Sequence, residues 1–230
     1  MEHVLCNTHK LNEAWLVSYL DEYLNKNTKV LYLILDTSSS YSEEMLALEE
    51  KYSEGKREYE ALVMPLENYG VKRSNIKFFF LHETSLESLK NLIKEYDVVI
   101  AYGSGDVFMI EDVLYEAFRD YEGLYIGINE GALVSLDIYH NFEDEYESFD
   151  GIGLLSGFAL DILYKERENH IANLIRFLEE SDQSIVAFSD SGGGLMISEG
   201  SMELLGDAFI LNGDNLDELY NALETLRIWS

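Results

Sequence analysis

The feature that most constrains this chain is a series of short apolar runs that alternate with helical patterns. Residues 3–6, 29–37, 75–82, 97–103 and 123–128 are nearly continuous runs of aliphatic and aromatic residues. Such runs are typical of strands that are buried on both faces of a parallel sheet. The segments between them repeat apolar residues at helical spacing. Strand–helix–strand repetition therefore predicts an α/β fold with three layers, in which helices flank a mostly parallel sheet of the flavodoxin-like type.

The expected helices carry their own start and stop signals. The longest covers residues 42–69, with a possible break near Gly55 or Pro65. Thr84 and Glu87 have the spacing of a capping box and predict the start of another helix.

The last third of the chain predicts antiparallel character. Residues 139–151 are polar and acidic and indicate a loop, whereas 166–181 have the pattern of an amphipathic helix. Residues 193–211 indicate paired strands around Gly200, and the serines and glycines of 189–194 indicate a tight connection. No linker or repeat interrupts the pattern, so residues 1–230 are expected to form one domain.

Composition excludes several classes of partner. The chain has 44 acidic residues against 16 Lys and Arg, a formal net charge of −28. This charge repels phosphate backbones and anionic lipids, so we expect neither nucleic acid nor membrane as a partner. No apolar run is long enough to span a bilayer, no signal peptide is recognisable, and a cytoplasmic protein is expected. The single cysteine, Cys6, should be a small buried hydrophobe.

Two strand ends carry the residues expected to form a site. Gly103 and Gly105 follow one strand and would let backbone N–H groups turn outward, while Asn129 and Glu130 occupy the tip of a turn between strand and helix. Ligands of open parallel sheets bind outside the carboxyl ends of the strands. The expected ligand-binding residues are Gly103, Ser104, Gly105, Asp106, Asn129 and Glu130.

These motifs resemble those of the dipeptidase E and cyanophycinase family, serine peptidases with a class I glutamine amidotransferase-like fold. The family has a Gly-Gly-Gly-Asn turn where residues 103–106 read Gly-Ser-Gly-Asp. It has Gly-x-Ser-Ala-Gly-Ala where residues 127–132 read Gly-Ile-Asn-Glu-Gly-Ala. Weaker similarity at 11–15, 153–155 and 184–197 extends the resemblance over nearly the whole chain.

The resemblance implies that the catalytic triad is lost. The nucleophilic serine falls on Asn129, and an amide cannot be deprotonated to attack a carbonyl. The catalytic histidine falls near Ile162 or Leu163, and the third, acidic member could be Asp144. The chain is therefore expected to be a divergent homologue without serine peptidase activity.

Other residues could substitute for the triad. Glu130 could act as a general base, although a carboxylate stabilised at a helix start is the favoured interpretation. His140 is the histidine nearest the expected crevice in sequence, but it more simply belongs to the acidic loop. Ser104 is expected to cap a helix and Ser135 to be packed inside.

Three hypotheses remain. The chain is an inactive relative that binds a small polar molecule or short peptide, a hydrolase that uses Glu130, Asp144 or His140, or an acidic protein that binds a basic partner. The five histidines show no metal-site spacing. We expect no metal, no cofactor, and a monomer or homodimer.

Overall fold

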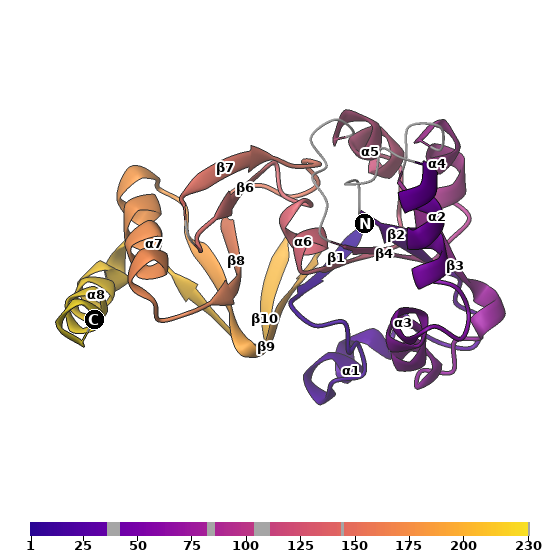
Figure 1. Cartoon of the computed structure of the whole chain (residues 1–230), viewed down its shortest axis with the longest axis horizontal. Coiled ribbons are helices and arrows are strands. Elements are labelled where there is room, and N and C mark those ends of the chain that lie inside the picture. Colours follow the sequence, from indigo (N-terminus) through magenta and orange to yellow (C-terminus); the bar gives the residue numbers. More distant parts are fainter. Residues whose placement is uncertain (36–41, 82–85, 104–110, 144, 230) are drawn as a thin grey trace.

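The computed structural model describes residues 1–35, 42–81, 86–103, 111–143 and 145–229 (Figure 1). The predicted capping box at Thr84 lies outside these residues. A mostly parallel sheet runs through the molecule and is flanked by helices, as the alternation of apolar runs predicts. Of the helices in the described ranges, none is both long and apolar enough to cross a bilayer.

The central sheet joins a parallel half, β1 to β5, to a second half of β8, β9 and β10, which we call the antiparallel half because β9 runs antiparallel to β1 and β10. The strands lie in the order β10-β9-β1-β5-β4-β2-β3, and β8 pairs with β9 in parallel. The pairings among β1, β5, β4, β2 and β3 are parallel, whereas β9 is antiparallel to both β1 and β10. The strands are β1 (Glu2–Cys6), β2 (Val30–Ile34), β3 (Ile76–Phe80), β4 (Val98–Tyr102), β5 (Leu124–Ile128), β8 (Ala159–Tyr164), β9 (Ile185–Ser198) and β10 (Ser201–Leu211).

The parallel strands are covered on both faces, which explains their continuous apolar sequence. In β2, Leu31 and Leu33 contribute to one core, whereas Tyr32 and Ile34 contribute to the core on the opposite face. Helices α4 (Leu86–Ile93), α5 (Glu111–Phe118) and α6 (Glu130–Leu133) belong to the first face. Helices α1 (Ala14–Leu20), α2 (Ser42–Lys51) and α3 (Arg57–Glu67) belong to the second.

A third core fills the antiparallel half. The amphipathic helix predicted over 166–181 is α7 (Glu168–Glu180), and α8 (Leu216–Trp229) packs beside it at the far end of the molecule (Figure 1). The described residues also include two 3₁₀ turns, η1 (Arg73–Asn75) and η2 (Gly213–Asn215).

The break expected in the long helix near Gly55 or Pro65 occurs at Gly55, whose φ of 86° is left-handed, while Pro65 lies inside α3. Two other predicted segments differ from the structure. The predicted loop over 139–151 contains a hairpin of β6 (Ile138–Asn141) and β7 (Glu147–Asp150), whose strands pair with each other and not with the main sheet. Residues 189–194 are not a connection but lie within the 14-residue strand β9, beside an irregularity in its pairing with β10.

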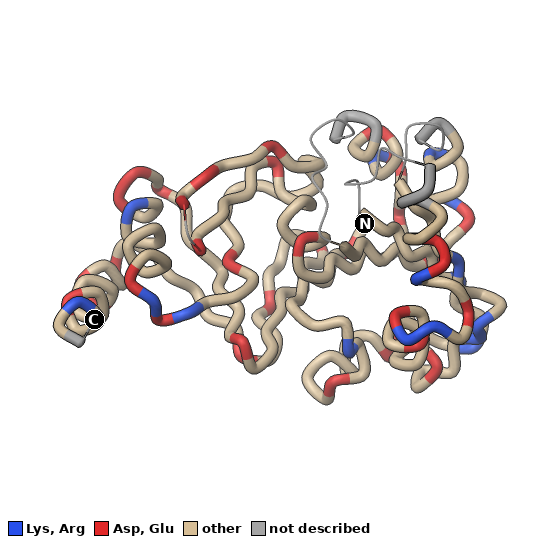
Figure 2. Tube along the Cα trace, viewed as in Figure 1, with Lys and Arg blue, Asp and Glu red and all other residues tan. Residues whose placement is uncertain are grey.

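Acidic residues occur along the whole fold, in both halves and on both sides of the sheet (Figure 2). This spread is the pattern of a general solvated exterior, in which most charges face water.

Candidate functional site

The two predicted strand ends lie side by side. β4 and β5 are adjacent parallel strands, paired from Val98 and Leu124 through to Tyr102 and Ile128. Gly103 therefore follows one strand and Asn129 the next, at the same carboxyl edge of the sheet. Gly103 has a φ of 134°, a conformation that favours glycine. The remaining members of that glycine turn, residues 104–106, lie outside the described residues.

Asn129 lies at the tip of the turn between β5 and α6, which we call the elbow, and its backbone there is strained. Its φ is 53° and its ψ −115°, which is sparsely populated for a residue with a side chain. The turn is fixed by backbone hydrogen bonds: Asn129 N–H donates to the Cys6 carbonyl at 2.9 Å, and the Asn129 carbonyl accepts from Ala132 N–H at 2.8 Å. Holding a residue in such a region costs on the order of 1–3 kcal/mol. The fold thus maintains a strained turn whose tip carries the amide side chain of Asn129.

The glycines on either side of the tip permit close packing of the turn. A Cβ on Gly131 would lie 2.1 Å from the Ala101 carbonyl oxygen of β4, and one on Gly127 would lie 2.7 Å from Ala132 Cα. The buried Tyr125 hydroxyl donates to the Gly131 carbonyl at 2.7 Å and holds the turn from beneath. The glycine spacing that carries the resemblance is therefore required by contact between α6 and the strands.

Glu130 is half-buried beside the tip. Burial raises the pKa of its carboxyl group, and a hydrogen bond from the backbone opposes this only in part. Burial also raises the pKa of Tyr102, and the charge of Glu130 adds to that effect. The elbow therefore holds one half-buried carboxyl group whose pKa is raised by burial, near a phenol at the end of β4.

Two other candidate residues, Ser135 and His140, form hydrogen bonds away from the elbow. Ser135 is buried, as predicted, and its hydroxyl donates to the Ala132 carbonyl at 2.6 Å. His140 lies on β6, with Nδ1 3.1 Å from the Ser148 hydroxyl and its ring edge-on to Phe177 of α7 at 4.8 Å between centroids. Burial lowers the pKa of His140, and the charge of Asp137 opposes the shift. Asp144 lies outside the described residues.

The segment that matches the family's catalytic histidine is strand β8. Ile162 and Leu163 lie near its end, and the Ile162 carbonyl accepts a hydrogen bond from the Asn7 side chain at 3.0 Å. The same amide donates to the Ser189 carbonyl at 2.7 Å and accepts from Gly193 N–H at 2.9 Å. Asn7 thus ties the end of β1 to β8 and β9, and it stabilises the junction between the two halves of the sheet.

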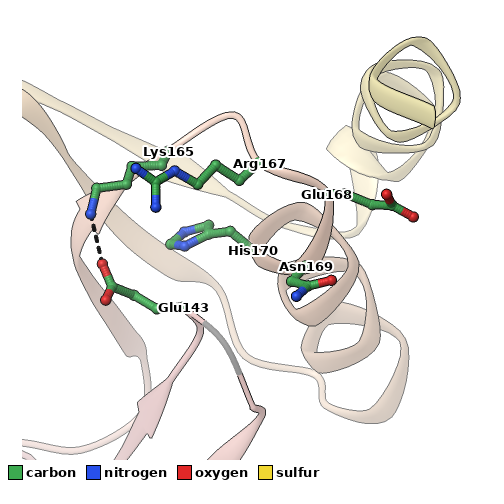
Figure 3. Close-up of a pocket in the computed structure, with 6 residues that line it drawn as sticks. All are labelled: Glu143, Lys165, Arg167, Glu168, Asn169 and His170. Carbon is green, nitrogen blue, oxygen red and sulfur yellow. Dashed lines mark hydrogen bonds and ion pairs between the residues drawn. The ribbon is translucent and has the colours of Figure 1, made fainter. Parts of the chain in front are cut away.

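Sequence reasoning missed a buried pair in the antiparallel half. His170 Nε2 lies 2.8 Å from Asp161 Oδ2, and the two residues are only 1% and 5% exposed. They are on different elements, α7 and β8, and no motif spacing links them. The available signals were local: a carboxylate within the apolar run 159–164 and a histidine on the apolar side of a helix. His170 borders a pocket of about 320 Å³, whose other lining residues are Glu143, Lys165, Arg167, Glu168 and Asn169 (Figure 3).

Metal ligation has no support within the described ranges, where no group of three or more His, Cys, Asp or Glu side chains is placed to hold an ion. Cys6 is fully buried in β1, and burial raises the pKa of its thiol to about 12. It is therefore an inert apolar residue, as predicted.

Comparison with known proteins supports the fold. No protein-family model and no curated protein sequence matches the chain. Among solved structures, the chain is similar to a candidate peptidase E protein from Listeria monocytogenes EGD-e. The TM-score is 0.53 at 14% identity, over 89% of this chain and 98% of that one. The predicted α/β architecture is thus confirmed, and the chain has a peptidase E-like fold.

Proposed function

We propose that this protein is a peptidase E-like protein without serine peptidase activity, which uses the crevice beside the elbow to bind a small polar molecule or short peptide. The observation that carries the proposal is the strained backbone at Asn129, kept at φ 53° around a side chain that cannot act as a nucleophile. The similarity to a candidate peptidase E at 14% identity supports the fold and carries no argument about catalytic activity.

Asn129 has the properties of a recognition group. An amide offers both a donor and an acceptor, and the turn holds it at the carboxyl edge where β4 and β5 end. Glu130 adds a second polar group with a raised pKa. A ligand with polar atoms of both kinds, such as a dipeptide backbone, suits this pair.

The first experiment tests for the absent nucleophile. A fluorophosphonate probe should not label the wild-type protein, because no hydroxyl occupies the tip of the elbow. Asn129→Ser alone should label poorly, because the hydroxyl lacks a base. Asn129→Ser combined with Leu163→His, or with Ile162→His, should increase labelling at residue 129. Stoichiometric labelling of a wild-type residue in the crevice would overturn the proposal.

The second experiment tests for the retained crevice. Dipeptides that begin with aspartate should bind without being cleaved, in a titration followed by NMR. Asn129→Ala should weaken this binding by about tenfold, the effect of losing one or two net hydrogen bonds. Ser191→Ala, an exposed change on β9, is the matched control. Binding that is indifferent to Asn129→Ala would exclude the elbow as the recognition site.

A hydrolase with unusual residues is the alternative function, and the raised pKa of Glu130 favours it. A carboxyl group whose pKa is raised is better suited to proton transfer than a fully solvated one. A screen of dipeptides and simple esters, with Glu130→Gln and His140→Ala beside the wild type, tests this function. Turnover that Glu130→Gln abolishes would establish it in place of ligand binding.

A further inference from the structure

The pocket in the antiparallel half is separate from the elbow and combines cations with an incompletely bonded histidine. It lies at the start of α7, where Lys165 and Arg167 approach from the preceding segment and Glu143 from the hairpin side (Figure 3). We propose that this pocket binds a small oxyanion that carries a proton, of which inorganic hydrogen phosphate is the simplest. The proposal is independent of the function proposed for the elbow.

Three groups supply positive potential. Lys165 lies 2.8 Å from Glu143, and Arg167 has no ion-pair partner within the part of the chain that the structure describes. The 13-residue helix α7 begins without a side-chain cap, so the N–H groups of its first turn remain to be bonded. Unbonded N–H groups at a helix start, together with the helix dipole, favour an anion.

His170 is the observation that points to a ligand. Its imidazole extends from α7 toward Lys165, Arg167 and Glu143 (Figure 3). Nε2 is bonded to Asp161, but Nδ1 is buried and has no hydrogen-bond partner among the described residues. A buried polar atom without a partner costs about 1–3 kcal/mol, so an occupant that bonds to Nδ1 is favoured.

The hydrogen bonds of Asp161 favour an oxyanion that carries a proton over one that does not. Asp161 Oδ2 accepts from His170 Nε2, and Oδ1 accepts from Leu163 N–H at 3.2 Å. When the neutral ring donates from Nε2, its Nδ1 is an acceptor and requires a donor. Hydrogen phosphate offers one O–H donor to Nδ1 and several acceptor oxygens to Lys165 and Arg167. Sulfate has acceptors alone and should bind less well.

The two glutamates at the pocket should affect the binding of an anion differently. Glu168 is directed away from the cations and is held by Arg227 of α8 at 2.9 Å (Figure 3). Glu143 instead bonds to Lys165 and competes with an incoming anion. Removing the charge of Glu143 should therefore strengthen binding.

The test is an NMR titration of the full chain with inorganic phosphate, with sulfate as the comparison. Phosphate should shift the backbone N–H signals of residues 168–170 and the imidazole ¹⁵N signals of His170 in a saturable way, at concentrations up to about 10 mM. Sulfate should need a concentration at least about tenfold higher, because it cannot satisfy Nδ1.

Variants separate this site from general attraction to cations. Arg167→Ala should weaken phosphate binding at least about tenfold, Glu143→Gln should strengthen it, and Lys26→Ala, at an exposed lysine elsewhere, should leave it unchanged. Arg167 and Glu143 are at the surface, so these variants should fold. Absence of a saturable shift, equal binding of sulfate, or indifference to Arg167→Ala would each overturn the proposal.

Discussion

The parallel and antiparallel halves of this molecule each place polar groups beside the sheet. In the parallel half the backbone positions them, whereas in the antiparallel half a contact between two side chains does. At the elbow, β4, β5 and α6 hold the glycines and the strained tip of a turn between strand and helix, and the tip carries an amide. In the antiparallel half, β8 and α7 hold a carboxylate–imidazole pair beside a pocket lined by charged residues of both signs, without any glycine motif.

The contrast shows that backbone geometry and reactive groups are separable in this fold. Close packing around Gly131 and Gly127 requires a particular backbone whether or not a nucleophile follows. The Asp161–His170 pair instead depends on two side chains that satisfy each other in a buried setting. The first region should therefore tolerate changes to its polar side chains, and the second should not.

The largest expected effect is at the buried pair. His170→Leu should lower the free energy of unfolding by about 3–5 kcal/mol, because it leaves the Asp161 carboxylate buried without its partner. Replacing both residues by leucine should recover much of this loss. Urea denaturation of the wild type, both single variants and the double variant measures the coupling between them.

The exposed pair of Lys165 and Glu143 is the control for that experiment. Its side chains are 27% and 51% exposed, so Glu143→Ala should cost less than about 1 kcal/mol. A loss of similar size at both pairs would contradict the argument from burial.

The next effect concerns the elbow backbone. Gly131→Ala should destabilise the protein by about 3 kcal/mol, because the new methyl group would overlap the Ala101 carbonyl. Gly213→Ala is the matched control, since a Cβ there meets nothing within 4 Å. Thermal denaturation distinguishes them. If the two variants melt alike, the glycines of the elbow are not needed for packing.

The sequence predicts the parallel half well because its signals are local. A strand buried on both faces is a continuous apolar run, and a tight turn from strand to helix needs glycine at fixed positions. The pairing of β4 with β5 places Gly103 and Asn129 at the same edge of the sheet. Ser135 was expected to be packed, and its burial follows from its place one turn into the apolar stripe.

The antiparallel half was predicted less well because its structure depends on distant pairing. The polar residues of 138–150 form a hairpin apart from the main sheet, so its strands lack the apolar alternation of a half-buried strand. β9 continues through Ser189 and Gly193 because β8 supplies a partner for Ser189 and β10 supplies one for Gly193. The Asp161–His170 pair joins a strand to a helix, and sequence spacing cannot indicate that contact.

The smallest predicted effect tests whether the strain at the tip is retained for a reason other than stability. Asn129→Gly should raise the free energy of unfolding by about 1 kcal/mol, because glycine accepts φ 53° without strain and loses part of that gain through its more flexible unfolded state. Chemical denaturation measures the change. Glu199→Gly is the control: Glu199 also has a positive φ, of 50°, in the exposed turn between β9 and β10.

The left-handed region at Glu199 is less costly than the conformation of Asn129, so the control should gain less. If Asn129→Gly instead destabilises the protein, the amide contributes to stability. Ligand binding is then not needed to explain the presence of Asn129 at the elbow. If the variant is more stable but no longer binds dipeptides, Asn129 lowers the stability of the protein and is required for ligand binding. Functional sites commonly combine these two effects.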